Sequence, residues 1–492
     1  MSKGAHVKIA VIGIASVAVV GAMSAVTFFL LRPDNPAEPA IALQVPAQIA
    51  RPDPLRFEPG RTEDYEQAAA FGLSHVLFEK SPGGVVRAAQ RTARFRALVD
   101  DATAGTGIDP DIVEAIILLE SAGREDVIAG DDPANAAGLT QIVAGTATDF
   151  LGMRVDLEES RRLTRLLNEA VRRGDHVEAA RLRSERRQVD ERFDPEEALA
   201  GTVRYLTEAK KVFGRDDLAV VSYHMGIGNL SDVVRAYAAR DGDDIDATVR
   251  DGDIDYARLY FDSSPTAHRA SWELLASFGD DSQTYYWRVL GALGTMHLLR
   301  NDPERLERLA ELHDRLPSAA LVLHPPGASE RYADATQLGD AVTRGALVSV
   351  QPGTGAHFAI DPQLSKVLAP LSEAPTDYLA LRPRAARFLA YLSAKVYELS
   401  REERPLALTR AAYDEEVATT LTPHDPGATA DADVHGTGFA FDIRRRYGSG
   451  AQAAAFQWAL ERLEALGLIA WTRGRSVIHV VVSPRATAAA RS

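Results

Sequence analysis

The sequence contains no cysteine. This absence excludes a disulfide framework, a metal site built from thiolates and a cysteine for lipid attachment. The composition is otherwise ordinary for a globular protein, with 46% apolar and 25% charged residues. A chain of 492 residues is too long for one hydrophobic core, because single cores stop growing beyond about 250 to 300 residues. We therefore expect two folded domains.

Net positive charge is also lacking, since the formal charge is -14 at pH 7. A nucleic-acid partner needs clustered lysine and arginine to replace the counterions of its phosphates. The arginine-rich stretches at residues 161–165 and 181–187 are interspersed with glutamate, which is typical of a solvated helix face. The sequence thus argues against nucleic-acid binding.

The amino-terminal part has one long uncharged apolar run, residues 9–31. At a rise of about 1.5 Å per residue, a helix of this length crosses a hydrocarbon core of roughly 30 Å. Lys3 and Lys8 precede the run, and Arg32, Asp34 and Glu38 follow it, so the positive-inside rule favours a cytoplasmic amino terminus. We expect residues 1–32 to form a single-pass transmembrane helix in the cell membrane, with the bulk of the chain outside the cytoplasm.

A cleaved signal peptide is the alternative, with the small residues 22–25 as its cleavage site. The apolar region of a signal peptide is usually about 7 to 15 residues long, whereas this run continues through Leu31. Residues 33–60 are rich in proline and alanine and have no regular period, which indicates a linker.

Helical patterning dominates residues 61–300. Apolar residues recur at helical intervals, as in Ile112, Ile116 and Leu119, and period-two runs are almost absent. Residues 155–190 are densely charged, and we interpret them as an inserted helical hairpin. The alternative is a solvated connecting helix without a chemical role.

The chain changes character after residue 300. A charged helix and a Pro-Pro pair indicate a linker over residues 301–330. Residues 331–492 mix β-branched runs with helical patterns, so we expect an α+β domain. The expected strands are residues 346–350 and 476–482, and the expected helices are residues 382–400 and 451–466.

Three short blocks follow one another in the helical part. They are Glu120-Ser121-Ala122-Gly123, Ala137-Gly138-Leu139-Thr140-Gln141 and Tyr223-His224-Met225-Gly226. In this order they resemble the lytic transglycosylases of the SLT, goose-lysozyme-like family. Thr140 stands where that family has Met, and His224 stands where it has Asn. The resemblance implies a mostly α, lysozyme-like domain over residues 61–300.

Glu120 is the residue that this resemblance makes catalytic. A helix over residues 109–120 would bury Ile112, Ile116 and Leu119 and end with Glu120 facing a cleft. Burial and the negative end of the helix dipole both raise a carboxyl pKa, which suits a general acid near neutral pH. The family is understood to use this one carboxylate, without a cofactor, to break the bond between N-acetylmuramic acid and N-acetylglucosamine in peptidoglycan and form a 1,6-anhydro product.

The resemblance also implies substrate contacts. Gln141 and the backbone around Gly138 are expected to orient the acetamido group of the substrate. Tyr223 is expected to hydrogen-bond near Glu120 or near the same group. Ser121 is expected to support Glu120 rather than act as a nucleophile, because no histidine and acid partner is evident nearby.

Two other functions remain open. A hydrolytic muramidase would need a second carboxylate, for which the candidates are Glu125, Asp131 and Asp132. A non-catalytic peptidoglycan-binding scaffold is favoured by the departure at His224 and opposed by the presence of Glu120.

A second motif lies in the α+β part. The string from His435 to Asp442, His-Gly-Thr-Gly-Phe-Ala-Phe-Asp, resembles the His-x-x-Gly-x-Ala-x-Asp element of zinc D,D-peptidases of the VanY type. In that family these two residues and a later histidine, here His479, bind zinc, while an arginine element, here at Arg410, fixes the substrate carboxylate. Two histidines and one carboxylate with an open fourth position suit catalytic zinc. Zinc is therefore an expected cofactor of residues 331–492, which would bind or trim stem peptides.

One departure affects the chemistry of this second site. The family has a glutamate three residues before the second histidine as its catalytic base, and here Ser476 stands in that place. Glu461 and Asp433 are candidates to replace it, and a metal-free wall-binding domain is the alternative. We interpret three isolated histidines as structural or surface residues: His224, His357 and His424.

These patterns combine into one hypothesis, a membrane-anchored cell-wall enzyme with a peptidase-like second domain. Glycan strands and peptide cross-links occur in the same polymer, so the two assignments support each other. The expected partners are peptidoglycan and the membrane, and the sequence indicates no particular protein partner.

Overall fold

The computed structural model describes residues 53–242, 244–316, 318–325, 327–353, 355–362, 378–421, 434–484 and 486. The expected transmembrane helix and most of the expected linker at 33–60 lie outside these residues. None of the helices in the described part is both long and apolar enough to cross a membrane. The chain divides into two compact units, the first with residues 86–260 and 270–300, the second with residues 53–85, 261–269 and the described residues from 301 onward.

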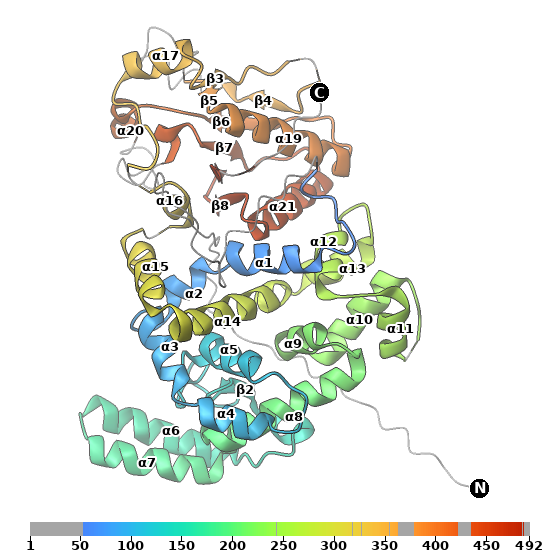
Figure 1. Ribbon diagram of the computed structural model, residues 1–492, viewed down its shortest axis with the longest axis vertical. Coiled ribbons are helices and arrows are strands. Elements are labelled where there is room, and N and C mark those ends of the chain that lie inside the picture. The colour runs from blue at the N-terminus through green and yellow to red at the C-terminus, as the bar shows by residue number, and fades with distance from the viewer. Residues whose placement is uncertain are drawn as a thin grey trace. The chain divides into compact units, whose positions relative to one another are not determined.

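The first unit is almost entirely helical, as expected from the periodicity (Figure 1). Its α-helices are α3 (Val85–Ala93), α4 (Arg96–Thr103), α5 (Pro110–Ser121), α6 (Leu157–Arg172), α7 (His176–Val189), α8 (Pro195–Phe213), α9 (Asp216–Met225), α10 (Ile227–Ala238), α11 (Ile245–Gly252), α12 (Tyr256–Asp262), α13 (Arg269–Ser277) and α14 (Tyr285–Asn301). Its shorter elements are the strands β1 (Ala136–Ala137) and β2 (Ile142–Val143), the π-helix η1 (Thr146–Phe150) and the 3-10 helices η2 (Glu191–Phe193) and η3 (Asp281–Thr284).

Aspartate begins many of these helices. The side chain of each capping aspartate accepts a hydrogen bond from a backbone N–H of the first turn, as at Asp109, Asp156, Asp175 and Asp194. Such a bond satisfies one of the N–H groups that a helix leaves without an internal partner. Proline follows Asp109 and Asp194, at a position where its missing N–H costs nothing. These starts are therefore encoded locally.

The core of the first unit forms around α8. This helix contacts α4, α9 and α11, and Leu199 and Leu206 on it are almost completely buried. The charged stretch at 155–190 forms a helical hairpin of α6 and α7, which pack on each other through a cluster of their own. That cluster consists of Leu163, Leu167, Ala170, Ala179 and Leu182.

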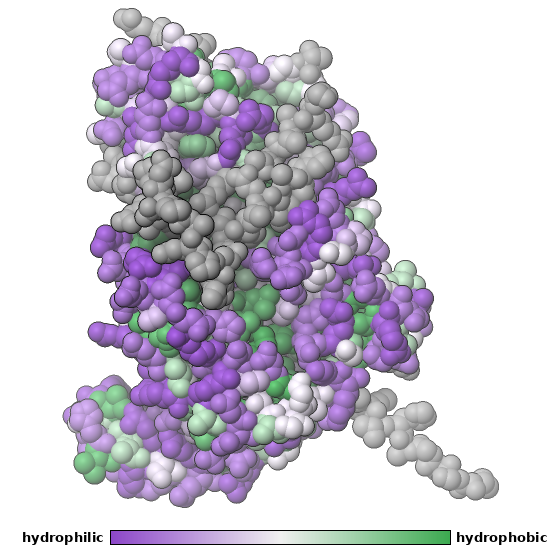
Figure 2. All heavy atoms as spheres, in the orientation of Figure 1, coloured by the Kyte–Doolittle hydropathy of each residue, from purple (hydrophilic) through white to green (hydrophobic). Residues whose placement is uncertain are grey.

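The outer face of the hairpin is polar, with exposed ion pairs such as Arg162 to Glu159. The tip of the hairpin is apolar, because Val171 and Val177 there are 52% and 83% exposed. Figure 2 shows a hydrophobic area at the lower left, where the end of this hairpin lies.

The second unit is an α+β domain, which confirms the expected mixture of helix and strand in the carboxy-terminal part. Its helices are α1 (Thr62–Gly72), α2 (His75–Lys80), α15 (Pro303–Arg315), α16 (Ala319–Leu323), α17 (Ala335–Thr343), α19 (Pro383–Ser400), α20 (Glu415–Leu421), α21 (Gly450–Ala465) and the 3-10 helix η4 (Val434–Thr437). Its strands are β3 (Val348–Ser349), β4 (Phe358–Ile360), β5 (Ala380–Leu381), β6 (Leu406–Arg410), β7 (Ala440–Arg444), β8 (Ile469–Arg473) and β9 (Val477–Val482).

Five of these strands form one sheet in the order β4-β6-β7-β9-β8. The β4–β6 pair is parallel and the other three pairs are antiparallel. The expected strand at 346–350 is shorter than predicted, because only β3 forms a ladder there, and it pairs with β5 outside this sheet. In the central strand β7, Asp442 lies opposite Arg410 of β6 and His479 of β9.

Residues 53–85 pack within the second unit, although we expected residues from 61 onward to belong to the helical domain. A Cβ atom on Gly72 of α1 would lie only 2.5 Å from the carbonyl oxygen of Glu464 in α21, so glycine permits this close helix contact. Lys395 Nζ lies 2.7 Å from Asp53 Oδ2, and the Tyr391 hydroxyl donates a hydrogen bond of 2.7 Å to Asp53 Oδ1. The close approach at Gly72 thus places residues 53–85 against α21, and the ion pair of Asp53 with Lys395 holds them against α19.

Candidate active site and candidate metal centre

Glu120 lies in the last turn of α5, which ends where Ala122 adopts a left-handed conformation with a φ of 54°. The buried part of α5 is wider than the expected stripe, since residues 113–118 are all buried. Ile112 and Leu119, which we expected in the core, are only partly buried. The core therefore surrounds the middle of the helix, while Leu119 and Glu120 are partly exposed near its carboxyl end.

The Tyr285 hydroxyl donates a hydrogen bond of 2.8 Å to Oε1 of the Glu120 carboxyl. Burial raises the pKa of Glu120 to about 7, against the opposing effects of the Tyr285 hydrogen bond and the positive charge of Arg288. Many protein atoms surround the carboxyl, yet the residue remains partly exposed. A carboxyl of this kind can exchange protons with a bound molecule near neutral pH.

Tyr285 begins α14 and belongs to a ladder of rings. It stacks on Tyr223 with ring centroids 6.5 Å apart and on His224 at 5.0 Å. Tyr205 contacts the edge of Tyr223 at 5.2 Å. Glu120 reaches this ladder through Tyr285, whereas Tyr223 was expected to hydrogen-bond near Glu120 or near the acetamido group of the substrate.

Tyr223 bonds to the 137–141 block instead. Its hydroxyl donates a hydrogen bond of 2.9 Å to the carbonyl oxygen of Thr140 and lies 3.2 Å from Thr202 Oγ1. Thr202 Oγ1 in turn donates to Thr140 Oγ1 at 2.9 Å. The threonine that replaces the family's methionine is thus part of a buried hydrogen-bond network that joins α8 and α9 to this loop.

His224, which replaces the family's asparagine, lies beside the same site. Its Nδ1 atom is 3.0 Å from Ser282 Oγ. Burial lowers the pKa of His224, and together with the positive charge of Arg288 it outweighs the opposing charges of Asp280 and Asp281. A neutral ring stacked on Tyr285 is therefore the form expected at neutral pH, which agrees with our interpretation of His224 as structural.

Gln141 is held in an unusual backbone conformation, with a φ of 54°. Its side-chain amide nitrogen donates to the carbonyl oxygens of Val127 at 3.1 Å and Gly138 at 2.8 Å. Both N–H groups of the amide are therefore used within the loop. The side-chain oxygen is therefore the atom through which Gln141 could contact a substrate.

Gly138 has a packing function in the structure. Its φ is 82°, and a Cβ atom would lie only 1.7 Å from the carbonyl oxygen of Arg192. Its N–H donates to Val127 at 2.8 Å, and its carbonyl accepts from Gln141. Ser121 likewise bonds within its helix, with Oγ donating to the Ile117 carbonyl at 3.2 Å. Substrate contacts by Gly138 and Ser121 stay predictions.

Sequence reasoning missed the pair of Asp190 and Arg192, which are both completely buried. The Arg192 guanidinium bonds to Asp190 and also donates to the carbonyl oxygens of Pro133, Asn135 and Ile142, at 2.6 to 3.1 Å. One side chain therefore shapes the loop that carries the Gly138 and Gln141 block. A run of charged residues in the sequence gave no signal that this arginine is in the core.

The three candidates for a second carboxylate have other partners or are exposed. Glu125 forms an ion pair with Arg187 of α7. Asp132 pairs with Arg161 of α6 at 2.8 Å, and this hydrogen bond lowers the pKa of Asp132. Asp131 is exposed.

The candidate metal residues converge in the second unit. Asp442 Oδ1 lies 3.2 Å from His435 Nε2 and 2.8 Å from His479 Nδ1, and one ligand atom from each of the three side chains lies within 4.8 Å of the others. Strand pairing explains the second contact, because Asp442 and His479 are directly opposite on β7 and β9. His435 comes from η4, and Tyr413 stacks on its ring at 5.1 Å.

Burial alone would raise the pKa of Asp442, but the charges and hydrogen bonds of His435 and His479 outweigh it and hold this pKa well below its usual range. Asp442 is therefore a carboxylate, the form that binds metal ions. Arg410, expected to hold a substrate carboxylate, lies in the same cluster, with Nη1 3.5 Å from Asp442 Oδ2.

The remaining predictions for this site have mixed outcomes. Ser476 is exposed and directly precedes β9. Glu461 accepts a hydrogen bond of 2.6 Å from Gln457 on α21. His357 stacks on Tyr397 at 3.9 Å, as a structural residue would. Asp433 and His424 lie outside the described residues.

Residues 175–245 match the family described as Transglycosylase SLT domain. The matched range spans α7 to α10, includes Tyr223 and His224, and begins after Glu120 and Gln141. No curated protein matches the chain. The match supports lytic transglycosylase activity with peptidoglycan as the substrate. Residues 175–245 of the helical part are therefore similar to transglycosylase SLT domains.

Proposed function

We propose that this chain cleaves the β-1,4 bond between N-acetylmuramic acid and N-acetylglucosamine and releases 1,6-anhydro products, with Glu120 as the single acid and base. The observation that carries this proposal is the partly exposed Glu120 carboxyl with a pKa of about 7, hydrogen-bonded to Tyr285. Near neutral pH such a group is present in both protonation states, as one residue with both tasks requires.

The proposed reaction has two proton transfers. Protonated Glu120 donates its proton to the glycosidic oxygen as the bond from this oxygen to C1 of the muramoyl sugar breaks. The substrate's own acetamido group stabilises the positive charge that develops at C1. The Glu120 carboxylate then accepts the proton of the muramoyl 6-hydroxyl, whose oxygen bonds to C1. Glu120 ends protonated, as it began, and no water is consumed.

Two side chains would orient these groups. Tyr285 holds Oε1 of Glu120, which directs the second carboxyl oxygen toward the substrate. Gln141 offers only its amide oxygen, so we propose that it accepts a hydrogen bond from the acetamido N–H of the muramoyl sugar. Tyr223 supports this loop through Thr140 and acts as a positioning residue.

The partners of Glu125 and Asp132 favour this proposal over a hydrolytic muramidase that would use either of them. A second catalytic carboxylate must be available to water or substrate. Glu125 and Asp132 are instead neutralised by Arg187 and Arg161.

For the second unit we propose zinc binding by His435, Asp442 and His479 and contact with stem peptides. The donor set fits zinc, because two imidazole nitrogens and one carboxylate oxygen lie near the spacing that a tetrahedral ion requires. Zinc bound there would supply a Lewis acid for a peptide carbonyl. Arg410 would orient a substrate carboxylate, while the serine at 476 offers no strong base. Binding of stem peptides is therefore the function we favour over rapid peptide cleavage.

The central experiment uses the full-length chain with purified peptidoglycan and mass spectrometry of the released muropeptides. We expect anhydro products from the wild type and none from Glu120→Gln, which keeps the shape and the hydrogen bond from Tyr285. Glu169→Gln, on the exposed face of α6, is the matched control and should behave as wild type. Reducing-end products that contain added water would indicate a muramidase, and binding to the wall without any release would indicate a scaffold.

A further inference from the structure

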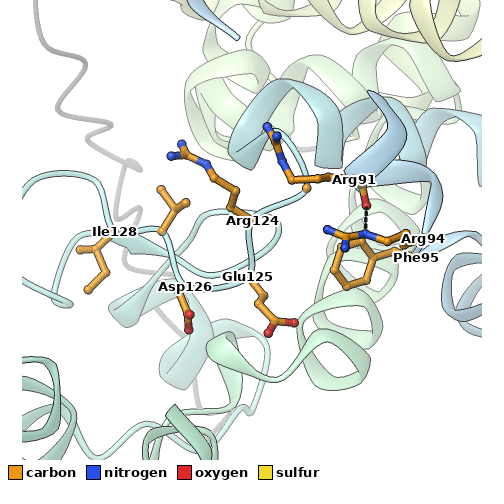
Figure 3. Close-up of a pocket in the computed structure, with 9 residues that line it drawn as sticks. Arg91, Arg94, Phe95, Arg124, Glu125, Asp126 and Ile128 are labelled. Atoms are coloured by element: carbon orange, nitrogen blue, oxygen red, sulfur yellow. Dashed lines mark hydrogen bonds between the residues drawn. The ribbon is translucent and has the colours of Figure 1, made fainter. Parts of the chain in front are cut away.

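A cleft of about 760 Å³ lies next to the end of α5 (Figure 3). The end of α3, the start of α4 and residues 123–128 line it. Gly123 makes this arrangement possible, because its φ is 71° and a Cβ atom would lie 2.6 Å from the backbone nitrogen of Thr92. Helix α3 therefore passes directly beside the chain that follows Glu120.

Three arginines line this cleft: Arg91, Arg94 and Arg124. Arg91 Nε donates to the carbonyl oxygen of Ala122 at 3.0 Å, and Arg124 Nε donates to that of Ser121 at 3.0 Å. Both bonds go to the carboxyl end of the helix that carries Glu120. Cations are favoured at this end of a helix, which explains part of their placement.

Helix capping does not account for the whole cluster. Among the residues that the structure describes, Arg94 and Arg124 have no ion-pair partner, and each bonds only to a backbone carbonyl through Nε. Burial and the like charges of Arg124, Arg94 and Arg87 lower the pKa of Arg91, so these cations are close enough to repel one another. Such repulsion is relieved by an anion.

The two carboxylates that line the cleft do not supply that anion. Asp126 is bound by Arg183 at 2.5 Å and Arg186 at 2.8 Å, and Glu125 is bound by Arg187. All three of these arginines belong to α7. The hairpin thus neutralises the acidic side of the cleft, which leaves a net positive surface in a chain whose overall charge is -14.

We propose that Arg94 and Arg124 bind carboxylates of the stem peptide on the muramoyl sugar that Glu120 acts on. This inference rests on the proposed function and names the part of the substrate that the site selects. The stem peptide is attached to the same sugar whose bond is cleaved, and its free carboxylates are the principal anions of this substrate. Guanidinium groups bind carboxylates through strong charge-assisted hydrogen bonds.

The test is a binding measurement that does not need catalysis. Soluble glycan fragments are used with their stem peptides intact and after an amidase has removed them. Binding to full-length Glu120→Gln is measured by titration calorimetry, alone and combined with Arg94→Gln plus Arg124→Gln. We expect the arginine substitutions to weaken binding of peptide-bearing glycan about tenfold or more and to leave binding of peptide-free glycan unchanged.

Two further variants control this test. The Lys versions of both residues keep the charge and should restore much of the affinity. Arg172→Gln removes an exposed arginine from the far end of α6 and should have no effect. Equal weakening for both glycans, or no weakening for either, would overturn the proposal. Absence of anhydro products from the wild type would contradict the proposed reaction, whereas arginine-dependent binding in that case would still support the carboxylate subsite.

Discussion

The Tyr285 hydroxyl donates a hydrogen bond of 2.8 Å to Oε1 of Glu120, across a separation of 165 residues in the chain. The bond favours the carboxylate form and lowers the pKa of Glu120, whereas burial raises it by more. The balance between these effects sets the pH range in which Glu120 can act as both acid and base.

Replacing Tyr285 by Phe should shift the pH profile of the reaction. Cleavage begins with protonated Glu120, so kcat/KM of the wild type should fall above a pH of about 7. Loss of the hydrogen bond destabilises the carboxylate, so this fall should move to higher pH, and turnover should decrease about tenfold from poorer orientation. Tyr205→Phe is the control, since that hydroxyl donates to the Ser222 carbonyl instead. An unchanged profile in Tyr285→Phe would contradict the positioning role.

Glu120→Gln should stabilise the protein at alkaline pH. A folded pKa of about 7, above the ordinary glutamate value of 4.5, means that the folded state binds the proton more tightly than the unfolded state. Wild-type stability is therefore lost as the pH rises from the unfolded to the folded pKa. At pH 8 the variant should gain about 1 to 3 kcal/mol in free energy of unfolding, and at pH 4 the gain should vanish. Thermal unfolding at both pH values measures this, and a gain that is equal at both would contradict the raised pKa.

Gly138→Ala should unfold the loop that carries Gln141. The added Cβ would overlap the Arg192 carbonyl at 1.7 Å and would also occupy a positive φ, so we expect a loss of about 3 kcal/mol or more. Gly174→Ala is matched in φ, at 72°, with nothing within 4 Å, and should cost only about 1 kcal/mol. Chemical denaturation distinguishes the two, and equal losses would show that contact with Arg192 is unimportant.

Arg192→Met should be among the most destabilising changes in the first unit. It removes the cation that pairs with the buried Asp190 carboxylate and the guanidinium that donates to three backbone carbonyls, and breaking a buried ion pair costs about 3 to 5 kcal/mol. The double variant Asp190→Asn with Arg192→Met should be less unstable than the sum of the two single variants. Additive losses in a double-mutant cycle would argue against coupling of this pair.

Zinc should bind the full-length chain at one site. After dialysis against zinc and then metal-free buffer, we expect His435→Ala and His479→Ala to retain less than about a tenth of the wild-type zinc, because a structural ligand is lost. His357→Ala, which removes a ring stacked on Tyr397, should retain it all. Zinc retention equal to wild type in all three variants would contradict the site and favour a metal-free domain.

Local patterns predicted much of the fold because their causes are local. Asp109 followed by Pro110 encodes the start of α5, and charged periodicity encodes the hairpin of α6 and α7. The resemblance of the string from His435 to Asp442 to zinc D,D-peptidases also implied a cluster with His479, and antiparallel pairing of β7 and β9 places Asp442 opposite His479.

Only the tertiary structure decided how these groups act. Glu120 contacts Tyr285 and not Tyr223, because α14 packs beside it. The position of α14 depends in turn on many weak contacts between segments that are distant in the sequence. The burial of Arg192 and the cationic cleft next to the end of α5 have the same origin, because arginines in a charged sequence look alike until folding sets their neighbours. The sequence by itself therefore determined which residues can carry the chemistry, while long-range packing determined their partners, their burial and hence their protonation.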